Sequence, residues 1–354
     1  MRPESVQEAA ALLRGLNRPV RPIGGGTKPW IASRDEEVLE TGGLDRIVEH
    51  NVGDFTAVLE AGVTLQHAQS VFAQHNQRLA WYPPDPGGAT IGGIVATADS
   101  GPLRHRYGGV RDLVVGITVV LSDGTVAKAG GKVIKNVAGY DLAKLFAGSF
   151  GTLGLIASVS VRLHPLPEQT ATIALEHDDP DRLLAEVLTL AKRPLESDTF
   201  DVTWVDGKGR LLMQFSGASA LDQASRAGNV VDVDWDEVRA LQRAPGGGAA
   251  LKVSGRPTDL PNVIRAASEH GATVVSRAAL GLSWLAFQPG DDLAERVANV
   301  RQTLSPRHCT VLDGADRIGD QWPSDVPGQV VMERLKARFD PARIFRPGVF
   351  VGGI

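Results

Sequence analysis

The chain has 354 residues, a formal net charge of −4 and one cysteine. This length suits one large or two medium domains with buried cores, and the slightly acidic balance excludes the basic surface typical of nucleic-acid-binding proteins. A single thiol excludes an internal disulfide, and it excludes an iron–sulfur cluster held by this chain alone, because such clusters need about four thiolates. It also indicates a reducing, cytoplasmic location, and no run of about 18 apolar residues predicts a membrane-spanning helix.

In the first half of the chain, predicted helices and strands alternate with glycine-rich loops. Ser5 and Glu8 form a capping box that begins a helix, and a short strand at 20–25 leads into the first glycine loop. An amphipathic helix and further strands follow, with a hairpin turn at Asp123-Gly124, at residues 54–62 (strand), 64–77 (helix), 112–130 (hairpin) and 154–167 (strand).

Past residue 167 the pattern changes to strands and helices with fewer glycines. Residues 250–314 read as strand, helix, strand, strand, helix, strand, which is the order of a ferredoxin-like unit. Residues 171–217 resemble a partial copy of that unit. The sequence therefore predicts a second α+β domain, followed by a short helix and an irregular tail.

Three glycine clusters stand between residues 24 and 154: Gly24-Gly25-Gly26-Thr27, Gly87 to Gly93, and Gly148 to Gly154. Successive glycine amides can face one point and form a concave nest for an anion such as a diphosphate. A single cluster is more simply a tight turn, whereas three in one domain favour a bound dinucleotide. Neither the G-x-G-x-x-G fingerprint nor a Walker P-loop occurs, so a Rossmann dehydrogenase and a P-loop ATPase are excluded.

The segments "PIGGGTK", "YPPDPGGATIGGIVATADSG", "KNVAGYDLAKLFAGSFGTLGLI" and "FDPARIFRPGVF" resemble the FAD-binding fold of the vanillyl-alcohol-oxidase type. Within it the sequence is most similar to the 2-hydroxyacid dehydrogenase branch and its glycolate oxidase FAD-binding subunits. The resemblance implies an α+β chain: a two-subdomain FAD-binding fold over 1–167, a ferredoxin-like α+β cap domain over 168–320, and a C-terminal segment, 321–354, that returns to the FAD domain.

The resemblance also implies which residues contact FAD. The first loop would face the diphosphate. In the second loop, a side chain at either glycine of the pair 92–93 would collide with the dinucleotide. In the third loop, Phe150 replaces a glutamate of the family. The implied FAD-binding residues are Ile23, Gly24, Gly25, Gly26, Thr27, Lys28, Pro84, Asp85, Thr90, Gly92, Gly93, Ala96, Thr97, Ser100, Gly101, Gly139, Tyr140, Gly148, Gly151 and Ile156.

Catalytic residues are harder to assign. Active members of the branch bind a divalent metal through a His-x-x-x-x-x-x-His pair and a later Glu-His, whereas residues 168–354 hold only His177, His270 and His308, none at that spacing. No metal site is therefore expected. The remaining candidates are His105, as a base or flavin anchor, and Lys135 and Tyr140, which could polarise the flavin; for His105, a solvated loop histidine is the simpler interpretation.

Three functions remain open on these residues. The favoured one is an FAD-holding subunit of a glycolate oxidase complex, beside a larger homologous FAD-containing catalytic subunit and an iron–sulfur subunit that could attach the complex to the inner membrane. The complex would oxidise a small 2-hydroxyacid. The alternatives are a self-sufficient FAD-dependent dehydrogenase of a small hydroxyacid or alcohol, and a cofactor-free assembly subunit, which the intact glycine loops disfavour.

Overall fold

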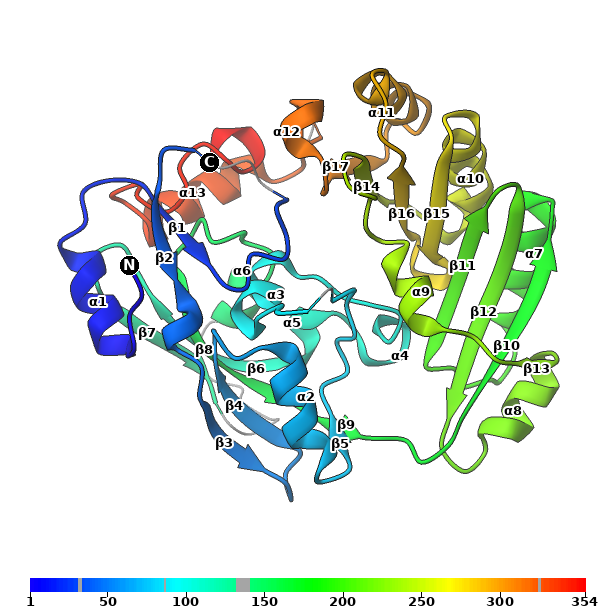
Figure 1. The fold of residues 1–354 in the computed structure, drawn as a ribbon, viewed down its shortest axis with the longest axis horizontal. Coiled ribbons are helices and arrows are strands. Elements are labelled where there is room, and N and C mark those ends of the chain that lie inside the picture. Colours follow the sequence, from blue (N-terminus) through cyan, green and yellow to red (C-terminus); the bar gives the residue numbers. More distant parts are fainter. Residues whose placement is uncertain (31–33, 86, 132–140, 324–325) are drawn as a thin grey trace.

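The computed structural model describes residues 1–30, 34–85, 87–131, 141–323 and 326–354. Two α/β regions lie side by side, each around its own sheet (Figure 1). We call residues 1–167 the N-terminal region and residues 168–320 the cap region. The mixed α+β class predicted from the sequence is confirmed. Among the described residues, no helix is both long and apolar enough to cross a membrane.

A five-stranded antiparallel sheet forms the centre of the N-terminal region. Helices pack on it through Phe72, Ile94 and Phe146, which are fully buried with the inward-facing residues of the strands. In spatial order the strands are β3 (Ile47–Asn51), β4 (Thr56–Glu60), β8 (Leu155–Arg162), β6 (Val114–Val120) and β7 (Val126–Gly130).

Smaller elements surround this sheet. The first strand pair is parallel, β1 (Val20–Ile23) with β2 (Glu37–Glu40), and the other is antiparallel, β5 (Gln77–Arg78) with β9 (His164–Pro165). The predicted first helix begins at its Ser5 cap, whose side chain accepts from the Glu8 amide. The helices of the region are α1 (Val6–Arg14), α2 (Leu65–Ala73), α3 (Ile91–Thr97), α4 (Arg104–Tyr107), α5 (Val110–Leu113) and α6 (Leu142–Phe146).

The cap region holds one eight-stranded sheet made of two ferredoxin-like units joined edge to edge by β11 and β15. The second unit, predicted from the sequence, comprises β14 (Ala249–Ser254), α10 (Leu260–Glu269), β15 (Ala272–Arg277), β16 (Leu282–Phe287), α11 (Leu293–Thr303) and β17 (His308–Val311). The first comprises β10 (Thr170–His177), α7 (Pro180–Leu190), β11 (Thr199–Val205), β12 (Lys208–Ser216), α8 (Ala220–Ala227) and β13 (Val230–Val231).

The expectation of a partial first copy is wrong, because that unit is complete. Its last two elements cannot be predicted from a periodic pattern of large apolar residues. Helix α8 buries only alanines, Ala220, Ala224 and Ala227, and β13 is two residues long. The strand order of both units is nevertheless the same, with the final strand beside the first.

The two faces of the cap sheet have different roles. Helices α7, α8, α10 and α11 cover one face, where they share a core with the sheet. The opposite face contributes Leu212, Val275 and Trp284 to a second cluster that includes Trp30 of the N-terminal region. The bare face of the cap sheet therefore packs toward the N-terminal region, with α9 (Trp235–Ala240) between them.

The C-terminal segment follows α12 (Ala315–Ile318) and returns to the N-terminal region with α13 (Gln329–Phe339). Its anchor is Lys336, which is 2% exposed and whose Nζ donates to Thr152 O, Asp340 Oδ2 and Phe345 O at 2.6–2.7 Å. The Val20 amide in turn donates to Ile344 O at 2.6 Å. All three Lys336 donors are thus satisfied, which a buried ammonium requires.

We predict that Lys336→Met lowers the free energy of unfolding by about 3–5 kcal/mol, because it leaves a buried carboxylate and two carbonyls without their cation. Urea unfolding followed by circular dichroism measures the change. Lys144→Met is the matched control, since its ion pair with Asp141 is half-exposed and should contribute less than about 1 kcal/mol. Equal losses in the two variants would contradict the anchoring role.

Candidate functional site

A cavity of about 720 Å³ lies between the two regions. Its wall includes the first glycine loop, the start of α3, part of the third glycine loop, and two loops of the cap region. This volume is within the range of about 300–1,000 Å³ common for small-molecule and cofactor sites.

The first glycine loop follows β1 and passes along the cavity. All of its predicted residues, Ile23 to Lys28, line the wall. A Cβ at Gly24 would overlap Thr90 Oγ1, and one at Gly25 would overlap Gly88 O. These two glycines are therefore required because the second loop approaches the first so closely.

Gly26 differs from its neighbours. It adopts φ +66°, and a Cβ there would meet no atom within 4 Å. No described residue accepts a hydrogen bond from the Gly25 or Gly26 amide. Two neighbouring amides thus remain available to an anion at this edge of the cavity.

Hydrogen bonds between its own residues hold the second glycine loop in shape. Asp85 Oδ1 accepts from the Gly87 and Ala89 amides at 2.9 and 3.2 Å, and Thr90 caps α3 by accepting from the Gly93 amide at 3.3 Å. The residues of this stretch that line the cavity are Thr90, Gly92, Gly93, Ala96 and Thr97. Pro84 and Asp85 are not in the cavity wall; the Asp85 carboxylate shapes the loop.

At Gly92 the atoms that exclude a side chain belong to the protein itself. A Cβ at this position would lie 2.6 Å from Ala61 Cβ and 3.0 Å from Ala61 O. The protein's own Ala61 already excludes a side chain here, so glycine is required whether or not a dinucleotide is bound, and the predicted collision with a dinucleotide stays a prediction.

Of the third glycine cluster, Gly151 and Ile156 line the cavity and Gly148 does not. Phe150, which also lines it, has its ring centroid 5.4 Å from Trp322, 5.7 Å from Phe350 and 6.4 Å from Trp30. An aromatic cluster thus stands where the resembling family has a glutamate.

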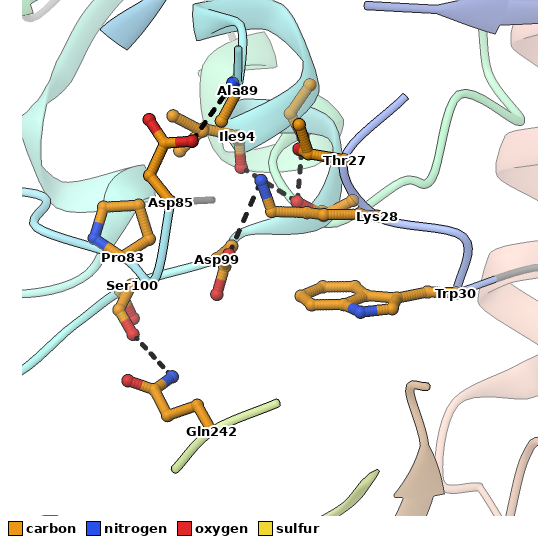
Figure 2. A network of polar contacts seen from close by, with 12 residues as sticks. Thr27, Lys28, Trp30, Pro83, Asp85, Ala89, Ile94, Asp99, Ser100 and Gln242 are labelled. Atoms are coloured by element: carbon orange, nitrogen blue, oxygen red, sulfur yellow. Dashed lines mark hydrogen bonds and ion pairs between the residues drawn. The ribbon is translucent and has the colours of Figure 1, made fainter. Parts of the chain in front are cut away.

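Ser100 and Gly101 lie apart from the cavity wall. A Cβ at Gly101 would overlap Tyr82 O, and Ser100 Oγ accepts from Arg104 at 3.2 Å. The Ser100 carbonyl accepts from Gln242 at 3.2 Å (Figure 2). Both residues are buried packing positions. The predicted sites at Lys135, Gly139 and Tyr140 lie outside the described residues.

His105 is not in the cavity wall. Its ring packs edge-on against Phe200 of the cap region, with centroids 5.6 Å apart, and burial lowers the pKa of this imidazole. The structure thus gives His105 a packing position between the two regions and does not bring it to the glycine loops. Among the described residues, no group of three or more His, Cys, Asp or Glu side chains gathers to hold a metal.

Lys28 provides a buried cation beside the cavity. Its Nζ is 3.5 Å from Asp99 Oδ2, and the two side chains are 7% and 3% exposed (Figure 2). Burial lowers the pKa of Lys28 and raises that of Asp99, while each charge opposes the shift of the other. The pair thus keeps a cation at the inner end of the first glycine loop.

Sequence reasoning missed the part of the wall that comes from the cap region. Arg243 donates through Nε and Nη2 to the two carboxylate oxygens of Asp313 at 2.9 Å, and through Nη2 to Thr27 O at 3.2 Å. Trp30 Nε1 donates to Asp313 Oδ1 at 3.1 Å. Beyond Arg243, residues 244–248 also line the cavity, and their "APGGG" sequence is a fourth glycine cluster that could have indicated this.

A second set of cations lies on the bare face of the cap sheet. Arg277 and Asp201 form a fully buried pair at 2.8 Å, and burial raises the pKa of Asp201 to about 6. Lys252, half-buried on β14, lies opposite Trp284 with its Nζ 5.7 Å from the ring centroid. No described carboxylate pairs with Lys252. Burial first, and then the nearby Arg104, lower the pKa of Lys252 to about 8.

We predict that Lys252→Met raises the free energy of unfolding at pH 7 by about 1–3 kcal/mol, because it removes a desolvated, unpaired charge. The native pKa lies below the unfolded one, so the gain is complete below pH 8 and vanishes as pH rises toward 10.5. Chemical denaturation from pH 7 to 10 measures it. Exposed Lys208→Met should change stability by less than about 0.5 kcal/mol, and a pH-independent gain for Lys252→Met would contradict the assignment.

Comparison with known proteins gives a consistent picture. The glycolate oxidase subunit GlcE of Escherichia coli is 27% identical over 311 residues, covering 85% of this chain and 83% of that protein. The D-lactate dehydrogenase of Archaeoglobus fulgidus is 30% identical over 250 residues, covering 64% of this chain and 56% of that protein. The glycolate oxidase subunit GlcD of Bacillus subtilis is 38% identical over 171 residues, covering 46% and 35%. The chain thus spans just over half of the length of the D-lactate dehydrogenase and about a third of the length of GlcD.

A solved structure of alkyldihydroxyacetonephosphate synthase shares the fold, with a TM-score of 0.71 and 15% identity, covering 98% of this chain and 75% of that one. The predicted FAD-binding fold with its cap is thereby confirmed. The model of the FAD binding domain family matches residues 1–130, which contain β1, the first two glycine loops and four of the five strands of the central sheet. Residues 1–130 of the chain thus match a family described as an FAD binding domain.

Proposed function

We propose that FAD binds in the cavity between the two regions. The cavity volume suits a dinucleotide, and the described residues of its wall include five basic side chains, Arg21, Lys28, Arg243, Arg317 and Arg346, against two acidic ones, Asp313 and Asp316. A net positive wall favours the two negative charges of a diphosphate. The open amides of Gly25 and Gly26 would bind phosphate oxygens, and Thr90 to Thr97 would lie along the remainder of the cofactor.

The chain would then act as the FAD-binding subunit of a glycolate oxidase complex. The observation that supports this most strongly is the match to GlcE, which runs along most of both chains, whereas the match to GlcD covers about half of this chain. The partners in this proposal are a larger FAD-containing catalytic subunit and an iron–sulfur subunit. The substrate class is a small 2-hydroxyacid.

When bound, the flavin supplies two-electron chemistry, accepting a hydride equivalent from the carbon that bears the hydroxyl group. This chain's own residues position and enclose the site. Trp30 and Phe150 contribute apolar wall, Lys28 supplies positive charge, and the cap loops complete the wall opposite the first glycine loop.

A second function, turnover of a hydroxyacid by this chain alone, is favoured by one observation. Lys252 lies near Arg104 and Asp99, and no described carboxylate forms an ion pair or a hydrogen bond with Lys252 or Arg104. Such cations suit a substrate carboxylate. The similarity to a D-lactate dehydrogenase agrees with this alternative.

The two functions predict different results for the purified chain. We expect the full chain to bind one FAD and appear yellow, yet to leave its flavin oxidised when glycolate or D-lactate is added without oxygen. Adding the GlcD-like and iron–sulfur subunits of the same host should restore dye reduction by glycolate. Spectrophotometry under anaerobic conditions measures both results.

Bleaching of the flavin in the isolated chain would replace the subunit proposal with the self-sufficient dehydrogenase. A colourless chain that takes up no FAD would overturn both. Denaturation should release the flavin in either case, which controls for adventitious colour.

A further inference from the structure

The cap region brings its own glycine cluster to the cavity. Residues 244–248 belong to the connection between α9 and β14, and every one of them lines the cavity together with Arg243. The Gly248 amide donates to Pro245 O at 2.8 Å, closing a turn. The loop on the other side of the wall, Ile23 to Lys28, also contains three successive glycines and comes from the other region.

Hydrogen bonds fix this cap loop beside the first glycine loop. The Ala244 amide donates to Asp313 Oδ2 at 3.0 Å, and Arg317 Nη1 donates to Gly248 O at 3.1 Å. Arg243 connects the same carboxylate to Thr27 O, so the two loops are held next to each other before any ligand binds.

Two amides of the cap loop have no partner in the described part of the chain. Neither the Gly246 nor the Gly247 amide donates to a described residue, and Arg243 Nη1 likewise has none. Gly246 is exposed, and a Cβ there would meet no atom within 4 Å. Protein packing therefore does not explain a glycine at position 246, in contrast to Gly24 and Gly25.

We propose that Gly246, Gly247 and Arg243 form a second phosphate-binding element, so that the FAD diphosphate is held between a loop of the N-terminal region and a loop of the cap region. This inference rests on the proposed binding of FAD in the cavity. Successive unpaired glycine amides beside a cation form the kind of nest that binds phosphate oxygens. The cap would then contribute directly to cofactor affinity.

Gly246→Val tests the element without strain, because the position is open and its φ is not positive. We expect the variant to bind FAD about tenfold or more weakly in fluorescence titrations of the full apo-protein, since it blocks bonds to a charged acceptor. Gly246→Asp should bind FAD still more weakly, because its carboxylate repels the phosphates. Added salt should reduce the difference in FAD affinity between the two variants. Riboflavin, which lacks phosphates, should bind all three proteins alike.

Gly53→Val is the matched control, since Gly53 is also exposed with no atom near its Cβ but lies in the turn between β3 and β4. Thermal unfolding verifies that each variant is folded. Unchanged FAD affinity in Gly246→Asp would overturn the inference. Equal losses of affinity for FAD and for riboflavin would also overturn it, because they would indicate that the loop contacts the flavin ring and not the phosphates. If the unmodified protein binds no FAD, the proposed function fails instead.

Discussion

The carboxylate of Asp313 accepts four hydrogen bonds at the boundary of the two regions, from Trp30, twice from Arg243, and from the Ala244 amide. Asp313 is 8% exposed, so losing these donors would leave a buried charge unsatisfied. This requirement fixes the position of the cap loop relative to the first glycine loop. The shape of the cavity between them depends on it, because each loop alone forms only one wall.

Much of the fold could be predicted from the sequence, since local patterns determine it. Strand alternation and helix caps located the elements of both regions, and the second ferredoxin-like unit followed from its order of strands and helices. The first unit was underestimated, because α8 and β13 have little apolar periodicity of their own and are stabilised by packing on β10 and β12. Tertiary contacts outweigh local signals in such short elements.

The site could be predicted only as far as its N-terminal half. Glycine clusters identify loops that approach something closely, but the sequence does not tell whether that neighbour is a ligand or another part of the chain. Gly92 illustrates the difficulty, because its neighbour is Ala61. The cap contribution was missed for a related reason: the bond between Trp30 and Asp313 joins residues 283 positions apart, and nothing local to either residue indicates the other.

The close approach of the first two glycine loops has a consequence for how this sequence can diverge. Gly24 and Gly25 are blocked by Thr90 and Gly88, so a descendant that no longer used a flavin would still retain both glycines for folding. Glycines retained at 24 and 25 would thus reflect the packing of the two loops and would not indicate that a relative still binds a flavin. Position 246, where neither sterics nor backbone conformation imposes a choice, is where drift should appear first once selection for the cofactor is relaxed.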